Sequence, residues 1–198
     1  MNRNRFALVA FSFVLVMAFA AASWATPSAG TFEINGGYSK SSTEVASPAT
    51  TDSPSGGIGF GAGYFRSIAP KTSWGIELAY ENLGGVDYTS GTDNHTTSVN
   101  MIRATPEFRM NFGAPVGPSF FAQAGAGYYG VHLKDENKTL ATDATLSKGK
   151  FGFNLGAGVG FPVGPKTKLN IMGNYHSVST EGTSTNYMCA RAGLALSL

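Results

Sequence analysis

The sequence predicts an all-β protein, an eight-stranded antiparallel up-and-down transmembrane β-barrel. Apolar side chains recur at every second position in eight separate stretches, which is the periodicity of strands. Charged residues make up only 13% of the chain, about half the usual share, and 26 residues are glycine. No run of about 18 apolar residues follows residue 25, so no transmembrane helix is indicated. A closed barrel is the other structure that satisfies every backbone group inside a bilayer.

The start of the chain predicts an export signal. Two arginines precede an apolar run at residues 6–22, and Ser23 and Ala25 place small side chains three and one positions before a cut. We therefore interpret residues 1–25 as a cleaved signal peptide and residues 26–198 as the barrel domain. An uncleaved signal anchor is the alternative, but the apolar run is short for a span. Cleavage removes two arginines and no acids, which changes the formal charge from +2 to zero and leaves no support for nucleic-acid binding.

The first four predicted strands lie at residues 31–38, 56–68, 73–82 and 97–112. In the second, Ile58, Phe60 and Tyr64 occupy one face and glycines occupy the other. A large apolar face backed by glycine or by ions suits a strand that meets lipid on one side and lines a narrow lumen on the other. Pro106 interrupts the fourth strand and cannot donate a ladder hydrogen bond, so we expect a bulge or bend there.

The last four predicted strands lie at residues 119–133, 150–163, 168–178 and 186–198. The second and third of these form the clearest hairpin, with Gly164 and Pro165 as the turn. Short turns alternate along the chain with long polar loops, which we expect at residues 41–55, 84–96, 134–147 and 180–185. This rhythm is typical of an up-and-down barrel whose termini and short turns share one end.

Aromatic residues near the strand ends fit the two interfacial girdles of a membrane barrel, although ordinary strand packing is an alternative for some of them. They are Tyr38, Tyr64, Trp74, Tyr80, Phe112, Phe120, Tyr128, Phe161, Tyr175 and Tyr187.

Through this alternation, loop rhythm and last strand, residues 31–198 resemble the small eight-stranded outer-membrane β-barrels, the family of the OmpA transmembrane domain and OmpX. The resemblance implies export to the outer membrane of a Gram-negative-type bacterium, insertion by the barrel-assembly machinery, and contact with outer-membrane lipid and lipopolysaccharide. Family members usually end in an aromatic residue that the assembly machinery recognises. This chain departs from that pattern because it ends in Leu198.

The inward faces of the predicted strands carry charge of both signs. An eight-stranded barrel is just wide enough for side chains to fill, and charges removed from water need opposite partners. We therefore predict a lumen ionic network that makes the barrel a plug; the resemblance implies that such networks close off the lumen or gate it. The alternative is that several of these side chains lie at strand ends in water. The predicted network consists of Glu33, Glu77, Glu107, Arg103, Arg109, Lys168 and Arg191; Glu81 and Lys150 also lie on the inward faces.

The sequence predicts no catalytic residue, cofactor or metal site. His95, His132 and His176 are scattered without metal-ligand spacing, and we interpret the single Cys189 as a lumen filler. Outer-membrane lipid A deacylases use a histidine and a serine two positions apart, but Val178 stands two positions after His176. We predict a non-enzymatic structural or surface-interaction barrel whose loops contact surface ligands. The alternative is a narrow porin-like pore or a conduit for small hydrophobic molecules.

Overall fold

The structure is a computed structural model. It describes residues 30–42, 45–46, 51–52, 55–90, 92–113, 117–137, 139, 142–180 and 183–198. The predicted signal peptide at residues 1–25 lies outside the described residues. The described part of the chain contains no helix with the length and hydropathy needed to span a bilayer.

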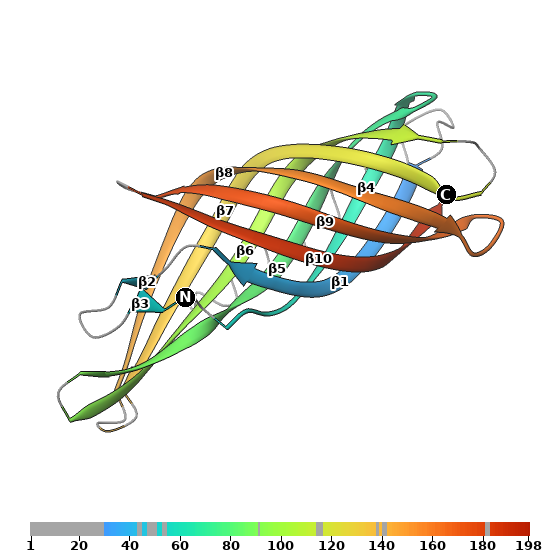
Figure 1. The fold of residues 1–198 in the computed structure, drawn as a ribbon. Helices are drawn as coiled ribbons and strands as arrows, with labels where there is room; N and C mark the ends of the chain where they lie inside the picture. Colours follow the sequence, from blue (N-terminus) through green and yellow to red (C-terminus); the bar gives the residue numbers. More distant parts are fainter. Residues whose placement is uncertain are drawn as a thin grey trace.

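Eight antiparallel strands close into a barrel in which neighbours in sequence are neighbours in space (Figure 1). The ring order is β1-β10-β9-β8-β7-β6-β5-β4, and a separate two-stranded pair, β2 and β3, lies in the connection between β1 and β4. This arrangement confirms the predicted fold class. The strands are β1 Gly30–Ser41, β2 Val45–Ala46, β3 Thr51–Asp52, β4 Gly57–Ala69, β5 Thr72–Ser90, β6 Asp93–Phe112, β7 Ser119–Asn137, β8 Thr142–Pro162, β9 Thr167–Thr180 and β10 Thr183–Ser197.

One end of the barrel, here called the turn end, holds the start of β1 and the end of β10. The amide of Leu198 donates a 2.9 Å hydrogen bond to the carbonyl of Gly30. The connections β4–β5, β6–β7 and β8–β9 lie at the same end, because the strands alternate in direction. The opposite end, here called the loop end, holds the remaining connections. The expected alternation of connections between the two ends is confirmed.

Three of the four loop-end connections are shorter than predicted, including the one expected at 180–185, where β9 ends at Thr180 and β10 begins at Thr183. Strand β5 continues to Ser90 and β6 begins at Asp93, and strand β7 continues to Asn137 before β8 begins at Thr142. Figure 1 shows these two hairpins extending past the rest of the barrel. The prediction of loops at 84–96 and 134–147 was wrong because polar composition was taken for irregular backbone. Outside the apolar band, ladder hydrogen bonds hold two strands together without an alternating apolar face.

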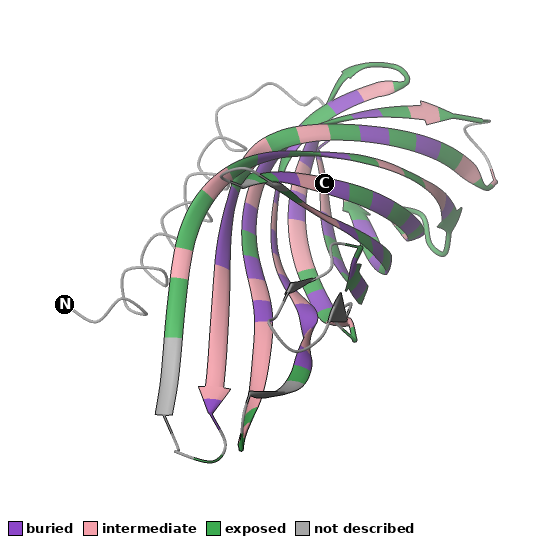
Figure 2. Cartoon of the chain, turned by 60° about the vertical axis from the view of Figure 1, so that its left-hand side comes forward, coloured by how far each residue is buried: buried purple, intermediate pink, exposed green. Residues whose placement is uncertain are grey.

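Inside and outside residues alternate along the strands within the barrel, whereas the loop-end parts of β6 and β7 are mostly half-buried without alternation (Figure 2). Ile58 and Phe151 are 75% and 68% exposed on the outer wall, whereas Glu77 is 1% exposed in the lumen. A single-layer wall has no second sheet to cover its apolar face, so that face meets lipid. The predicted outward direction of the large apolar residues is confirmed for the face as a whole.

The expected bulge at Pro106 is absent. The register of β6 is the same on both sides of Pro106, where the ladder to β7 merely lacks two pairs. The register of β5 against β6 shifts instead between Asn82 and Gly85. Gly84 has a φ of +88° there, and a Cβ would approach the backbone nitrogen of Gly56 to 2.2 Å. This bulge reverses the alternation, so that Leu83 and the later Val86, three positions apart, are both buried.

Candidate functional site

The lumen is the candidate site, because the side chains that point into it form two distinct layers. Strand β6 runs from the loop end to the turn end and carries Val99 and Met101 first, then Arg103, Glu107 and Arg109. All five are buried. An apolar layer therefore lies toward the loop end and an ionic layer toward the turn end.

Glu77 is the centre of the ionic layer. Its Oε1 accepts hydrogen bonds from Nη2 of Arg103 at 2.6 Å and from Nη1 of Arg191 at 2.5 Å. The same two arginines reach Glu81, with Nε of Arg103 3.6 Å from its Oε1. Ser39 donates a 2.6 Å hydrogen bond to the other oxygen of Glu81. Strands β1, β5, β6 and β10 are thus joined across the lumen.

Neutral polar residues complete the surroundings of Arg103. Its Nη1 donates to the hydroxyl of Thr105 at 2.7 Å, and that hydroxyl donates to Glu107 at 2.8 Å. Asn154 on β8 donates a further 2.8 Å hydrogen bond to the same oxygen of Glu107. Partners of this kind make burial of an ionic group tolerable, because each lost water contact is replaced.

Arg109 forms a second ionic cluster nearer the turn end. Its Nη1 lies 2.8 Å from Oε2 of Glu33, which also accepts a hydrogen bond from Asn170. The guanidinium lies between two aromatic rings, 4.0 Å from the centroid of Phe65 and 4.5 Å from that of Phe121. Contacts of a cation with two ring faces stabilise it where water is excluded.

The apolar layer contains residues that the sequence reasoning did not place in the lumen. Its members are Leu83, Val99, Met101, Tyr129, Val131, Val178 and Tyr187, with Leu133 packed against them. Tyr187, predicted for an interfacial girdle, is fully buried and stacks on His176 with centroids 4.3 Å apart. The signal that could have found these residues was present, since Val99 and Met101 share the alternation of Arg103.

Six of the seven residues predicted for the ionic network lie in the lumen, and one does not. Glu33, Glu77, Glu107, Arg103, Arg109 and Arg191 are buried and joined by the contacts above. Lys168 is a correction: it is exposed and takes part in none of those pairs. It alternates with the buried Asn170, but it is the second residue of β9, at the turn end, where a long side chain reaches water.

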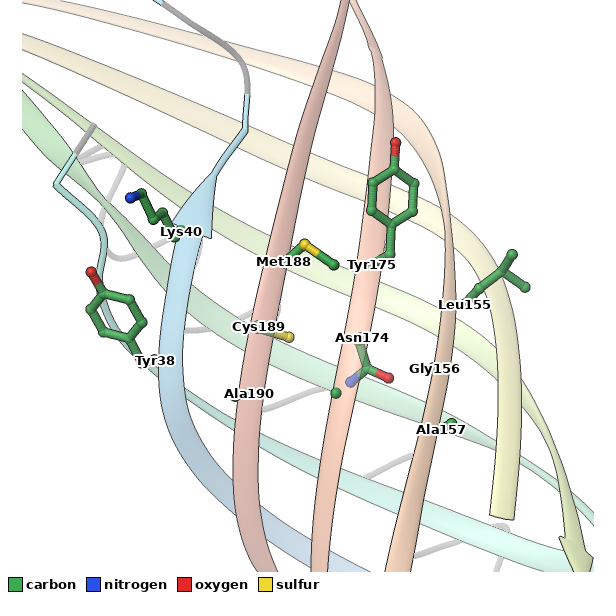
Figure 3. A pocket seen from close by; sticks show the side chains of 11 residues that line it. Tyr38, Lys40, Leu155, Gly156, Ala157, Asn174, Tyr175, Met188, Cys189 and Ala190 are labelled. Carbon is green, nitrogen blue, oxygen red and sulfur yellow. The ribbon is translucent and has the colours of Figure 1, made fainter. Parts of the chain in front are cut away.

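A groove on the outer wall runs across β1, β10, β9 and β8 (Figure 3). Its floor includes Ala157, Gly173 and Ala190, which are neighbours across the ladder. The next row toward the loop end carries the larger Leu155, Tyr175 and Met188, and Met188 pairs with Lys40. The groove therefore lies on the lipid-facing side, with one ammonium group at its edge.

Comparisons with known proteins agree with this architecture. Similar solved structures include Neisserial surface protein A (TM-score 0.57, 12% identity, 86% of this chain and 99% of that one). They also include the N-terminal β-barrel domain of Pseudomonas aeruginosa OprF (0.53, 12%, 86% and 98%) and a major outer membrane protein from Thermus thermophilus (0.55, 10%, 85% and 99%). These likenesses concern the fold.

The curated proteins contain no match to this sequence. The family described as outer membrane protein beta-barrel domain matches residues 8–196, nearly the whole chain. The chain therefore belongs to the outer membrane protein beta-barrel domain family and is a protein of the Gram-negative outer membrane.

Proposed function

We propose that this protein is a structural or surface-interaction barrel whose lumen is closed by its ionic network. The observation that carries the proposal is that arginines on one part of the wall reach carboxylates on another. Arg191 on β10 meets Glu77 on β5, and Arg109 on β6 meets Glu33 on β1. In each pair two strands separate the partners around the ring. These side chains therefore span the lumen rather than lie along its wall.

The apolar layer supports the same proposal at the loop end. Tyr129 and Tyr187 are fully buried beside His176, with the hydroxyl of Tyr129 3.2 Å from Nδ1 of the histidine. An ion that entered from the loop end would have to lose its hydration among these side chains. A narrow porin-like pore or a conduit for small hydrophobic molecules is the alternative, and either needs a continuous passage.

The hairpins at the loop end and the groove on the outer wall support a role in binding molecules outside the barrel. Beyond the barrel, the extended hairpins are joined by polar hydrogen bonds, including Thr97 to Asp135 at 3.2 Å and the amide of Asn94 to Thr139 at 3.0 Å. We propose that these hairpins contact surface ligands and that the groove beside Lys40 contacts outer-membrane lipid or lipopolysaccharide. Insertion by the barrel-assembly machinery and the absence of enzymatic activity belong to the same proposal.

Single-channel recording in planar bilayers tests the closed lumen. We expect the refolded protein to give no steady large conductance, because paired side chains occupy the axis. The variant Glu77→Ala/Arg103→Ala/Tyr187→Ala removes one charge of each sign from the ionic layer and one large side chain from the apolar layer, and should conduct. Migration on gels before and after boiling must first show that both proteins are folded. A steady large conductance of the folded unmodified protein would contradict the proposal and favour the pore.

A further inference from the structure

We infer that the lumen contains a binding site for one divalent transition-metal ion of the zinc class, with Glu81, His176 and Cys189 as its protein ligands. These residues come from β5, β9 and β10 and are 0%, 0% and 4% exposed. A carboxylate oxygen, an imidazole nitrogen and the thiol sulfur lie within 4.8 Å of one another. Sulfur, nitrogen and oxygen ligands of these three types are the ones that Zn²⁺ binds in proteins.

The separation of two of the ligand atoms fits a tetrahedral ion. The Sγ of Cys189 lies 3.5 Å from Nε2 of His176. Zn–S and Zn–N bonds of about 2.3 and 2.0 Å at a tetrahedral angle place sulfur and nitrogen about 3.5 Å apart. Ligand atoms in such a site are about 3.3–3.6 Å apart, so the carboxylate of Glu81 has to approach by at most about 1.5 Å. It would do so while keeping its contacts with Arg103 and Arg191.

Neighbouring side chains fix the orientation of the His176 ring, as they do for histidine ligands in metal sites. The hydroxyl of Tyr129 lies 3.2 Å from Nδ1 of His176, and the ring of Tyr187 stacks on the imidazole with an interplanar angle of 3°. A hydrogen bond at one ring nitrogen and a fixed ring plane orient the other nitrogen toward a metal. Here that other nitrogen is Nε2, which faces the thiol of Cys189.

The charges around the site favour a cation. Around Glu77 the ionic layer contains three buried carboxylates and two buried guanidiniums. Each carboxylate contacts an arginine, but the charges sum to one excess negative charge. A metal-bound thiolate adds a second, and a divalent ion balances both. Buried charge without compensation is costly, so this composition favours an ion there. The groups are Glu77, Glu81, Glu107, Arg103, Arg191 and Cys189.

A fourth ligand position can be taken by water. The hydroxyl of Tyr187 is buried without a hydrogen-bond partner, and Tyr187 pairs across the ladder with His176. A metal-bound water would provide that partner, and buried polar groups in native proteins nearly always have one. A three-ligand site that keeps one water is a known zinc arrangement.

Cobalt substitution tests the inference. The full mature chain is refolded in detergent after metal removal by a chelator, with Co²⁺ present because the site closes on folding. We expect one Co²⁺ per chain, a thiolate-to-cobalt charge-transfer band, tetrahedral d–d bands in the visible, and loss of all of them on adding Zn²⁺. Cys189→Ser should abolish the charge-transfer band, and His176→Gln should weaken Co²⁺ binding at least tenfold.

His132→Gln provides the control, because His132 lies outside the cluster and its removal should leave the spectrum unchanged. Gel migration before and after boiling confirms that each variant is folded. A folded unmodified chain without the band would overturn the inference, and would indicate that a proton on a carboxyl balances the charge instead. The same band in folded Cys189→Ser, or equal loss in His132→Gln, would also overturn it.

Discussion

The two layers of side chains in the lumen are held together by different physical contacts. In the ionic layer, Glu77 accepts hydrogen bonds from two arginines that belong to different strands. In the apolar layer, Met101 and Leu83 pack without any directional contact and are fully buried. Ionic contacts specify which strands must face each other, because a shift of register would separate the partners. Apolar contacts fill space and tolerate exchange among side chains of similar volume.

The largest effect is expected from removing the charge that serves several partners. Arg103→Ala leaves Glu77, Glu81 and Glu107 short of one cation in a buried site, so the free energy of unfolding should fall by about 3–5 kcal/mol. Urea unfolding in lipid vesicles measures it. Arg103→Lys keeps the charge but lacks the planar guanidinium. Its free energy of unfolding should therefore lie between those of the unmodified protein and Arg103→Ala. Equal stability of all three proteins would show that the ionic layer adds nothing.

A smaller effect is expected in the apolar layer. Met101→Ala removes a fully buried side chain from the cluster, so the free energy of unfolding should fall by about 2–4 kcal/mol through lost burial and a cavity. Met101→Leu nearly conserves the volume and should cost less than about 1.5 kcal/mol. The same urea titration compares them. If the leucine variant were as unstable as the alanine variant, the apolar layer would be as specific as the ionic one.

The smallest effect is expected at the turn end. Lys168→Gln removes an exposed charge outside both layers, so neither the urea midpoint nor the conductance should change measurably. This variant is the matched control for Arg103→Ala, because both remove one positive charge from the inward-facing side of a strand. A loss of stability comparable with that of Arg103→Ala would contradict this prediction and would show that Lys168 belongs to the ionic network.

Alternation alone predicted much of the site. Charged residues alternate along their strands with large apolar residues, and a period of two assigns the charged ones to the lumen. They include Glu33, Glu77, Arg103 and Arg109. The pattern does not show how far along the barrel axis a residue lies. Lys168 was therefore included in the predicted ionic network although it lies at the turn end. The apolar layer was missed although Val99 and Met101 share the alternation of Arg103, because large apolar side chains were expected to face lipid and the third predicted strand was ended before Leu83.

Local sequence by itself determined the number of barrel strands, their two faces and the end of the barrel at which both termini lie. Side-chain periodicity and turn residues act over a few neighbouring positions, so they can be read from the chain. Tertiary structure alone decided which residues meet across the lumen. Glu81, His176 and Cys189 lie on three strands and share no spacing in the chain. Only closure of the ring and the register of each strand bring their ligand atoms together, since these set the height at which every inward side chain points.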